Sequence, residues 1–245
     1  MIFLIKKRKL VLDMFTCQQQ VFDVAKPAMA SQFFPDWWKE LKTQMPDSRV
    51  VPQPTMKRCM GFVDHFKHGI IIPMWADFRA EIGKLGTQTH FALTSNGYTP
   101  IVQHPTNQRG SFAPPDKYCN LKLESPWAAR CKEDVYFKWE QPTWNMNNLT
   151  AYVVLPATVE FVYQHSINVH LMFPRTTIND VREIKFGTPI AHMTPLTERK
   201  LDVRHHLVSP TEYDRFLFGK RLTFLNSYRT YRRAKDNDTK GCPYA

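Results

Sequence analysis

The feature that most constrains the fold is a series of short apolar runs, interrupted by turn residues along almost the whole chain. Proline is frequent, with 18 residues against 9 glycines. Proline in such numbers suits rigid turns between short strands, whereas a βαβ fold needs long helices between its strands. The pattern therefore predicts a mainly β protein, a β-sandwich or jelly-roll-like fold in a single domain. The expected strands are Leu10–Thr16, Ile70–Trp75, Asp77–Ile82, Gln88–Leu93, Asn120–Glu124, Val135–Trp139, Tyr152–Leu155, Val159–Gln164, Ile167–Phe173, Glu183–Phe186, Ile190–Thr194 and Lys200–His206.

Helical patterns are short and lie mainly before residue 70 and at the C-terminal end. Proline and aspartate stand early in Phe34–Leu41, as in the first turn of a helix. In Phe62–His68 two phenylalanines share a helical face, and Gly69 can end that helix in the left-handed conformation. The segment Gly97–Lys117 lacks a clear period and is expected to be a long surface loop. We expect an N-terminal strand and arm over residues 1–46, a β-sandwich body over 47–208, and a basic helix with a tail over 209–245.

The C-terminal segment has the strongest local signal for a helix. Ser209 stands before Pro210, and Glu212 follows three residues after the serine, which is the pattern of a capping box. An aromatic and aliphatic stripe behind this cap keeps approximately to one helical face, so we expect the helix to dock on the β body. The stripe consists of Tyr213, Leu217, Phe224, Tyr228 and Tyr231.

Much of the net charge of +11 lies on this expected helix, in a window without any acidic residue. Such a basic face is typical of a solvated surface, of a contact with nucleic-acid phosphates, or of an assembly contact with an acidic partner, and these alternatives stay open. No run approaches the roughly 20 apolar residues that span a bilayer, so no membrane partner is expected. The basic residues are Arg215, Lys220, Arg221, Arg229, Arg232, Arg233 and Lys235.

The sequence motifs of catalysis and of metal binding are missing. There is no nucleophile elbow, no P-loop, no dinucleotide fingerprint and no C-x-x-C pair. No histidine is followed two residues later by an acidic residue or another histidine, as jelly-roll metal sites usually require. The nearest ligand candidates are His165 and His170, which fall on opposite faces of a continuous strand, while His65 and His68 can share a helix face. We expect no catalytic residue and no cofactor.

The six tryptophans offer possible stacking platforms for sugars or bases, although ordinary core and interface packing is the favoured explanation. Trp144 follows Gln141, Pro142 and Thr143 at an expected turn. We therefore expect Trp144 and Trp127 to be the most exposed of the six.

The N-terminus and the cysteines indicate where the protein works. The first apolar residues precede a basic run, which is the reverse of the order in a secretory signal peptide. The five cysteines are widely spaced and odd in number, as expected for reduced thiols. We expect a protein that remains inside a cell, or in a particle assembled inside one, and that no signal peptide exports.

Several short strings carry a resemblance that extends over most of residues 10–210. They are Ala25–Ala28 with Pro35–Lys39; Lys57–Cys59 with Phe62–Asp64 and Ile72–Asp77; Leu123–Trp127; and Phe186–Ile190. In these strings the chain resembles an uncharacterised family of proteins encoded by marine tailed phages, especially phages of cyanobacteria. The family has no known activity, so the resemblance implies no catalytic role for any residue.

The segment Phe186–Met193 is similar to the last hairpin of many jelly-roll and dUTPase-like folds. In those folds a strand, a glycine turn and a strand led by proline close the sheet. The catalytic motifs of dUTPases are not evident, so no nucleotide hydrolysis is inferred.

The leading hypothesis is a phage-encoded, non-catalytic β-sandwich protein that acts by binding, as a structural or assembly protein of the virion. Its partners would be other virion subunits or copies of itself, with nucleic acid as a further partner of the basic helix, and its location the virion or the host cytoplasm. The alternative is a cytosolic auxiliary enzyme of cupin or jelly-roll type, whose metal site is assembled from scattered histidines and carboxylates.

Overall fold

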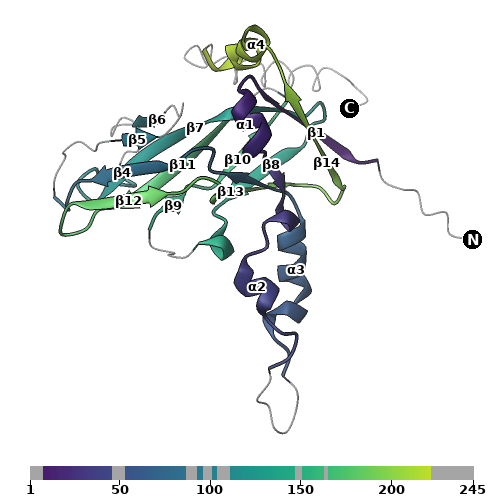
Figure 1. Ribbon diagram of the computed structural model, residues 1–245, viewed down its shortest axis with the longest axis horizontal. Coiled ribbons are helices and arrows are strands. Elements are labelled where there is room, and N and C mark those ends of the chain that lie inside the picture. Colours follow the sequence, from purple (N-terminus) through teal and green to yellow (C-terminus); the bar gives the residue numbers. More distant parts are fainter. Residues whose placement is uncertain are drawn as a thin grey trace, which may run out of the picture.

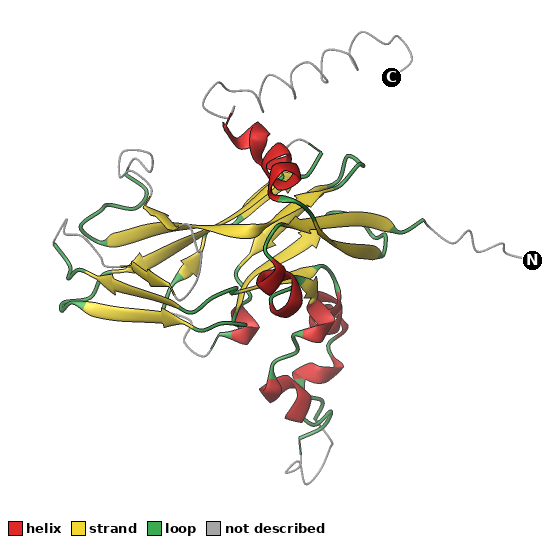
Figure 2. Cartoon of the chain, turned by 45° about the horizontal axis from the view of Figure 1, so that its top comes forward, coloured by secondary structure: helices red, strands yellow, loops and turns green. Residues whose placement is uncertain are grey.

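Strands are the commonest secondary structure of the described residues, and they pair into three sheets around one continuous hydrophobic core (Figure 1). Figure 2 shows these strands in two layers, with the short helices lying outside them. The expected mainly β, sandwich-like fold is confirmed by this computed structural model. The described residues are 8–45, 53–86, 93–95, 101–103, 111–146, 151–162 and 165–221.

The largest sheet has β1 (Leu10–Thr16) inside it rather than at its edge. This strand pairs in parallel with one neighbour and antiparallel with the other. Leu10, Leu12 and Met14 alternate along it and are buried in the core, as expected where one face of a strand packs inward. The sheet runs in the order β14 (Leu201–Leu207), β1, β7 (Tyr118–Arg130), β11 (Ser166–Pro174) and β9 (Val153–Val154), with β6 (Ile101–Gln103) also paired to β7.

The second sheet contains β3 (Ile70–Pro73), in which every residue is buried. This burial explains why the sequence shows three consecutive isoleucines there instead of an alternating pattern. A third, smaller sheet contributes Phe78 and Ile82 to the same core. The second sheet has the order β10 (Ala157–Glu160), β8 (Tyr136–Glu140), β13 (Pro189–Pro195), β3 and β2 (Ala28–Met29); the third has the order β12 (Asp180–Ile184), β4 (Phe78–Ile82) and β5 (Leu93–Ser95).

Most expected strands are present within a few residues of their expected ends, and the differences are local. The helix α1 (Gln19–Val24) was not expected, because its six residues are too few to show a helical period. Strand β6 interrupts the segment Gly97–Lys117 that was expected to be a loop. Most of the expected strand Gln88–Leu93 lies outside the described residues.

The expected closing hairpin at Phe186–Met193 is wrong. The glycine turn exists, with Gly187 at a φ of +78°. The strands on its two sides, however, enter different sheets: β12 pairs with β4, whereas β13 pairs with β3 and β8. The turn therefore passes the chain from one sheet to another. Local sequence shows the turn but not the partners of the strands beside it.

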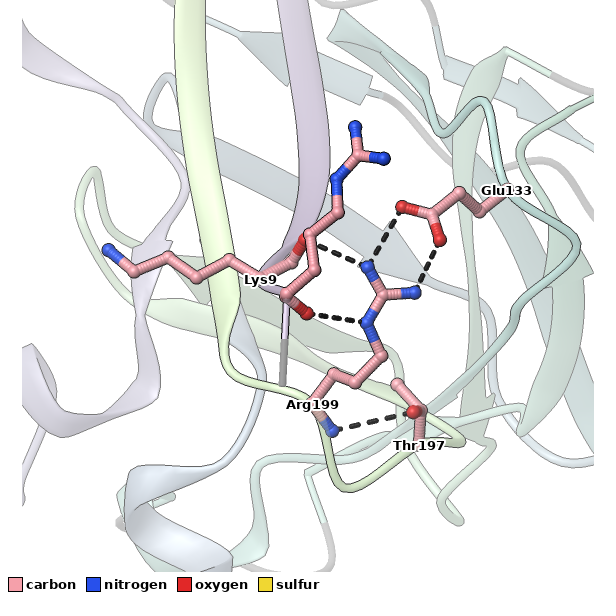
Figure 3. Close-up of polar contacts among 5 residues, drawn as sticks. Lys9, Glu133, Thr197 and Arg199 are labelled. Carbon is pink, nitrogen blue, oxygen red and sulfur yellow. Dashed lines mark hydrogen bonds and ion pairs between the residues drawn. The ribbon is translucent and has the colours of Figure 1, made fainter. Parts of the chain in front are cut away.

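Arg199 fastens the beginning of β1 to the loop before β8 (Figure 3). Its guanidinium donates to the backbone oxygens of Arg8 and Lys9 at 2.7 and 2.8 Å, and to both carboxylate oxygens of Glu133. These hydrogen bonds hold the pKa of the Glu133 carboxyl below its ordinary value. One side chain thus satisfies two backbone carbonyls at the point where the parallel strands β1 and β14 begin.

Residues 30–45 and 53–67, here called the arm, project from the sandwich and include two short α-helices (Figure 1). They contain α2 (Asp36–Glu40) and α3 (Met60–Lys67), and both agree with the helices expected there. Asp36 lies in the first turn of α2, where a carboxylate is favoured by the helix dipole. The arm then returns to the sandwich at Gly69.

Gly69 joins the arm to the core strand β3. Its φ is +86°, and a Cβ built on it would lie only 2.4 Å from the backbone oxygen of Met193. Its own carbonyl accepts a hydrogen bond from the amide of Ala30 at 3.0 Å. The turn needs glycine for two separate reasons, the left-handed conformation and the close approach of β13.

Gly69→Ala is expected to destabilise the fold strongly, by about 3 kcal/mol or more, because left-handed strain and a backbone clash combine. Gly86→Ala is the matched control: its φ is +81°, but nothing lies within 4 Å of the added Cβ. That variant carries the strain alone, about 1–2 kcal/mol. Urea unfolding of the two variants measures the difference, and equal losses would show that the approach of Met193 does not matter.

Candidate functional site

Six aromatic side chains fix the arm to the edge of the sandwich. Ring centroids lie 4.6 Å apart for Trp38 and Phe66, and 5.1 Å apart for Phe62 and Trp144. The indole N–H of Trp37 also donates to the backbone oxygen of Trp144 at 2.9 Å, which joins α2 to the turn η4 (Thr143–Asn145). The members of this aromatic clasp are Phe34, Trp37, Trp38, Phe62, Phe66 and Trp144.

The expected exposure is wrong for Trp127 and holds only in part for Trp144, because Trp37 is the most exposed of the six tryptophans, at 41%. Trp127 is only 1% exposed, and its indole N–H donates to the backbone oxygen of Ala25 at 3.0 Å inside the core. Trp144 does follow a turn, as expected, but the arm folds back over it and leaves it half-buried within the aromatic clasp. Trp127 therefore offers no open ring face for stacking. Its burial by distant segments cannot be seen in local sequence.

A histidine of the arm meets a histidine and a glutamate of the second sheet at the base of the arm. His65 lies on α3, and His192 and Glu140 are directly opposed on the neighbouring strands β13 and β8. The rings of His65 and His192 have centroids 4.7 Å apart, and His65 Nδ1 lies 4.0 Å from Glu140 Oε1. One possible ligand atom from each residue lies within 4.8 Å of the others. These three residues are here called the histidine–glutamate site.

His192 is the buried member of the site, with 3% of its surface exposed. Its Nε2 lies 2.7 Å from the backbone oxygen of His68. A carbonyl oxygen only accepts hydrogen bonds, so the proton of the neutral ring belongs on Nε2, and Nδ1 keeps its lone pair. Burial lowers the pKa of His192 and so favours this neutral form.

The other two members line an open groove with a volume of about 730 Å³. Glu140 has its second oxygen, Oε2, 2.7 Å from the ammonium of Lys138, which leaves Oε1 facing His65. The His68 ring is turned to the backbone oxygen of Pro195 at 3.1 Å. The polar lining therefore mixes both charges, and it includes Asp64, His65, His68, Lys138, Glu140 and Glu198.

Among the residues that the structure describes, His165 and His170 do not belong to a group of three possible metal ligands. His165 donates from Nδ1 to the backbone oxygen of Ala129 at 3.0 Å, and burial lowers its pKa. His170 lies on the following strand, β11. In the part of the chain that the structure describes, the histidine–glutamate site is the one group of three possible metal ligands.

Sequence reasoning found one member of this site and missed the other two. His65 was noted for its place on a short helix, paired with His68. Glu140 and His192 are 52 residues apart, and only the antiparallel pairing of β8 and β13 sets them side by side. No signal in a single sequence marks that pairing.

The C-terminal helix begins as expected. α4 (Pro210–Arg221) follows Ser209, whose Oγ accepts a hydrogen bond from the amide of Glu212 at 3.2 Å. Tyr213 is buried against the β body. Phe216, which was not part of the expected stripe, stacks on Phe15 with centroids 4.1 Å apart. Docking of this helix on the sandwich is thus confirmed over its first turns.

The basic residues of this helix lie partly beyond the described residues. The structure shows Arg215 as an exposed side chain on α4, and it places Lys220 and Arg221 in the helix backbone alone. Arg229, Arg232, Arg233 and Lys235 lie outside the described residues, as do Phe224, Tyr228 and Tyr231. A binding role for this surface stays a prediction.

Comparison with known proteins gives no assignment. No protein-family model matches the chain. No curated protein matches its sequence. Among the helices that the structure describes, none has the length and apolar character needed to cross a membrane. The candidate site is therefore interpreted from its geometry alone.

Trp144→Ala is expected to loosen the arm without unfolding the sandwich. Removing a half-buried indole from the aromatic clasp costs about 2 kcal/mol, at the low end of large-to-small core substitutions. Hydrogen exchange should quicken in α2 and α3 and stay slow in β1 and β7. Phe112→Ala is the control, since Phe112 is largely exposed. Unchanged exchange in the arm would contradict the role given to Trp144.

His165→Gln is expected to make stability less dependent on pH. Because the folded pKa of His165 is lowered from 6.5, the unfolded chain binds a proton more readily. The contribution of neutral His165 to the free energy of unfolding is fully present above about pH 6.5. It is lost progressively as the pH falls towards the lowered pKa of His165 in the folded state. The free energy of unfolding of the variant should therefore fall less between pH 7.5 and 5.5. Equal slopes for variant and natural chain would contradict this.

Proposed function

We propose that this chain is a non-catalytic assembly protein, which uses its β-sandwich as a platform and its arm as the docking element. The observation that carries the proposal is the exposure of large apolar side chains on the arm. The arm itself projects away from the β-sandwich (Figure 1). Scattered apolar residues on a surface are ordinary, but several on one projecting element are typical of a contact with another protein.

Three methionines and Trp37 are the exposed large apolar side chains of the described part of the arm. Met45, Met56 and Met60 have between 40% and 63% of their surface exposed. Met56 begins the short helix η2 (Met56–Arg58) and Met60 begins α3, with the extended Cys59 between them. The amide of Met45 donates to the backbone oxygen of Gln53 on the returning segment at 3.0 Å. Methionine is flexible and polarisable, and it is over-represented on surfaces that adapt to a partner.

The aromatic clasp supports the proposal because it gives the arm a defined position before any partner arrives. Asn145 donates to the backbone oxygen of Phe33 at 2.6 Å, in addition to the bond between Trp37 and Trp144. An element that is already ordered loses less conformational entropy when it binds. Exposed methionines on an ordered arm therefore favour docking into a neighbouring subunit.

The proposal extends to the virion, where the arm would bind another virion subunit or a second copy of the chain. This setting follows from the resemblance of several strings to phage proteins, which stays an expectation from the sequence, and from the lack of catalytic motifs in the sequence. The basic C-terminal segment, which begins on α4 with the exposed Arg215, would add a contact with an acidic neighbour or with nucleic acid.

The test compares two triple variants in particles purified from cells that make the whole phage. Met45, Met56 and Met60 are changed to serine together, and in the control Ile178, Val181 and Val153, which are similarly exposed elsewhere, are changed to serine. Quantitative mass spectrometry should find the natural chain and the control in particles, with the arm variant reduced at least about tenfold. Each exposed change should alter stability by less than about 0.5 kcal/mol. Absence of the natural chain from particles, or full incorporation of the arm variant, would overturn the proposal.

A further inference from the structure

We propose that the histidine–glutamate site, formed by His65, Glu140 and His192, binds one divalent transition-metal ion of the zinc class. This inference is independent of the docking role of the arm. It assigns a chemical function to the only part of the described surface where two imidazoles and a carboxylate converge. Two histidines with one carboxylate form a donor set that zinc and non-haem iron sites both use.

The distances fit a site that closes around an ion. Donor atoms around a tetrahedral ion with bonds of about 2.0 Å lie about 3.3 Å from one another. Here the three possible donor atoms lie within 4.8 Å of each other, and His65 Nδ1 is 4.0 Å from Glu140 Oε1. The donor atoms must therefore approach one another by up to about 1.5 Å. This movement falls on His65 and Glu140, whose side chains are both about one-third exposed.

The surroundings of His192 and Glu140 already orient them as ligands. The carbonyl of His68 accepts from Nε2 of His192 at 2.7 Å, which leaves Nδ1 as the donor atom. Ligand histidines usually make such a bond with their other nitrogen. The ammonium of Lys138 lies 2.7 Å from Oε2 of Glu140. The other carboxylate oxygen, Oε1, therefore remains for the ion. Opposite strand positions hold Glu140 and His192 in register.

A bound ion would keep an open position towards the groove. Three protein ligands leave at least one site for water or for an oxygen of a small anionic ligand, as in zinc centres that exchange ligands. The groove of about 730 Å³ beside His65 and Glu140 gives solvent access to that position. Such an ion would also link α3 of the arm to β8 and β13. An auxiliary enzyme of jelly-roll type would need a metal centre of this kind. His65, Glu140 and His192 would form it, and not His165 and His170.

The test uses the full, untagged chain, stripped of metal with EDTA and then loaded with Zn²⁺ or Co²⁺. Elemental analysis after removal of unbound ion should give one Zn²⁺ per chain. Co²⁺ should produce visible absorption bands of a tetrahedral or five-coordinate site with nitrogen and oxygen ligands. His65→Ala and Glu140→Gln should each weaken Zn²⁺ binding, the former by more than about 100-fold, because each removes a direct ligand.

His68→Gln is the matched control, since its side chain lines the same groove but bonds to Pro195 and is not in the ligand set. It should bind Zn²⁺ within about threefold of the natural chain. Circular dichroism checks that every variant is folded. Lack of stoichiometric metal in the natural chain would overturn the proposal. Undiminished Zn²⁺ binding by a folded His65→Ala variant would also overturn it. The same holds if only His68→Gln lost Zn²⁺ binding.

Discussion

The left-handed turn at Gly69 is the constraint on which the arrangement of arm, groove and core depends. At this residue the arm ends, the fully buried strand β3 begins, and the backbone of Met193 passes too close for any side chain. The turn therefore sets the direction of α3 relative to β13. Because His65 lies one turn of helix before Gly69 and His192 lies one residue before Met193, the same close approach also brings the two histidines together.

The aromatic clasp and the histidine–glutamate site act on the two sides of the same helix. Phe62 and Phe66 of α3 pack against Trp144 and Trp38, while His65 faces the second sheet. The clasp orders the arm through burial of aromatic surface, and a metal ion would add a second attachment between α3 and the strands. An arm fixed in this way can present Met56 and Met60 to a partner without first becoming ordered.

Local sequence predicted most helices and strands well. It predicted poorly which strands pair and which distant segments come into contact. The proline-rich spacing of apolar runs indicated the strands, Gly69 indicated the end of α3, and Ser209 indicated the start of α4, since each depends on neighbours in the chain. The buried Trp127, the half-buried Trp144 and the separation of β12 from β13 were missed. Each of these depends on strand partners or on a segment that folds back from far away. The site was missed for the same reason, because Glu140 and His192 meet only through the pairing of β8 with β13.

Anomalous diffraction tests most directly the claim that the Gly69 turn assembles a metal site between the arm and the sandwich. Crystals of the full chain grown with Zn²⁺ would be measured on both sides of the zinc absorption edge. The account predicts one strong anomalous peak about 2.0–2.2 Å from a nitrogen of His65, from Nδ1 of His192 and from Oε1 of Glu140. A peak that contacts other residues, or no peak at this position, would contradict it.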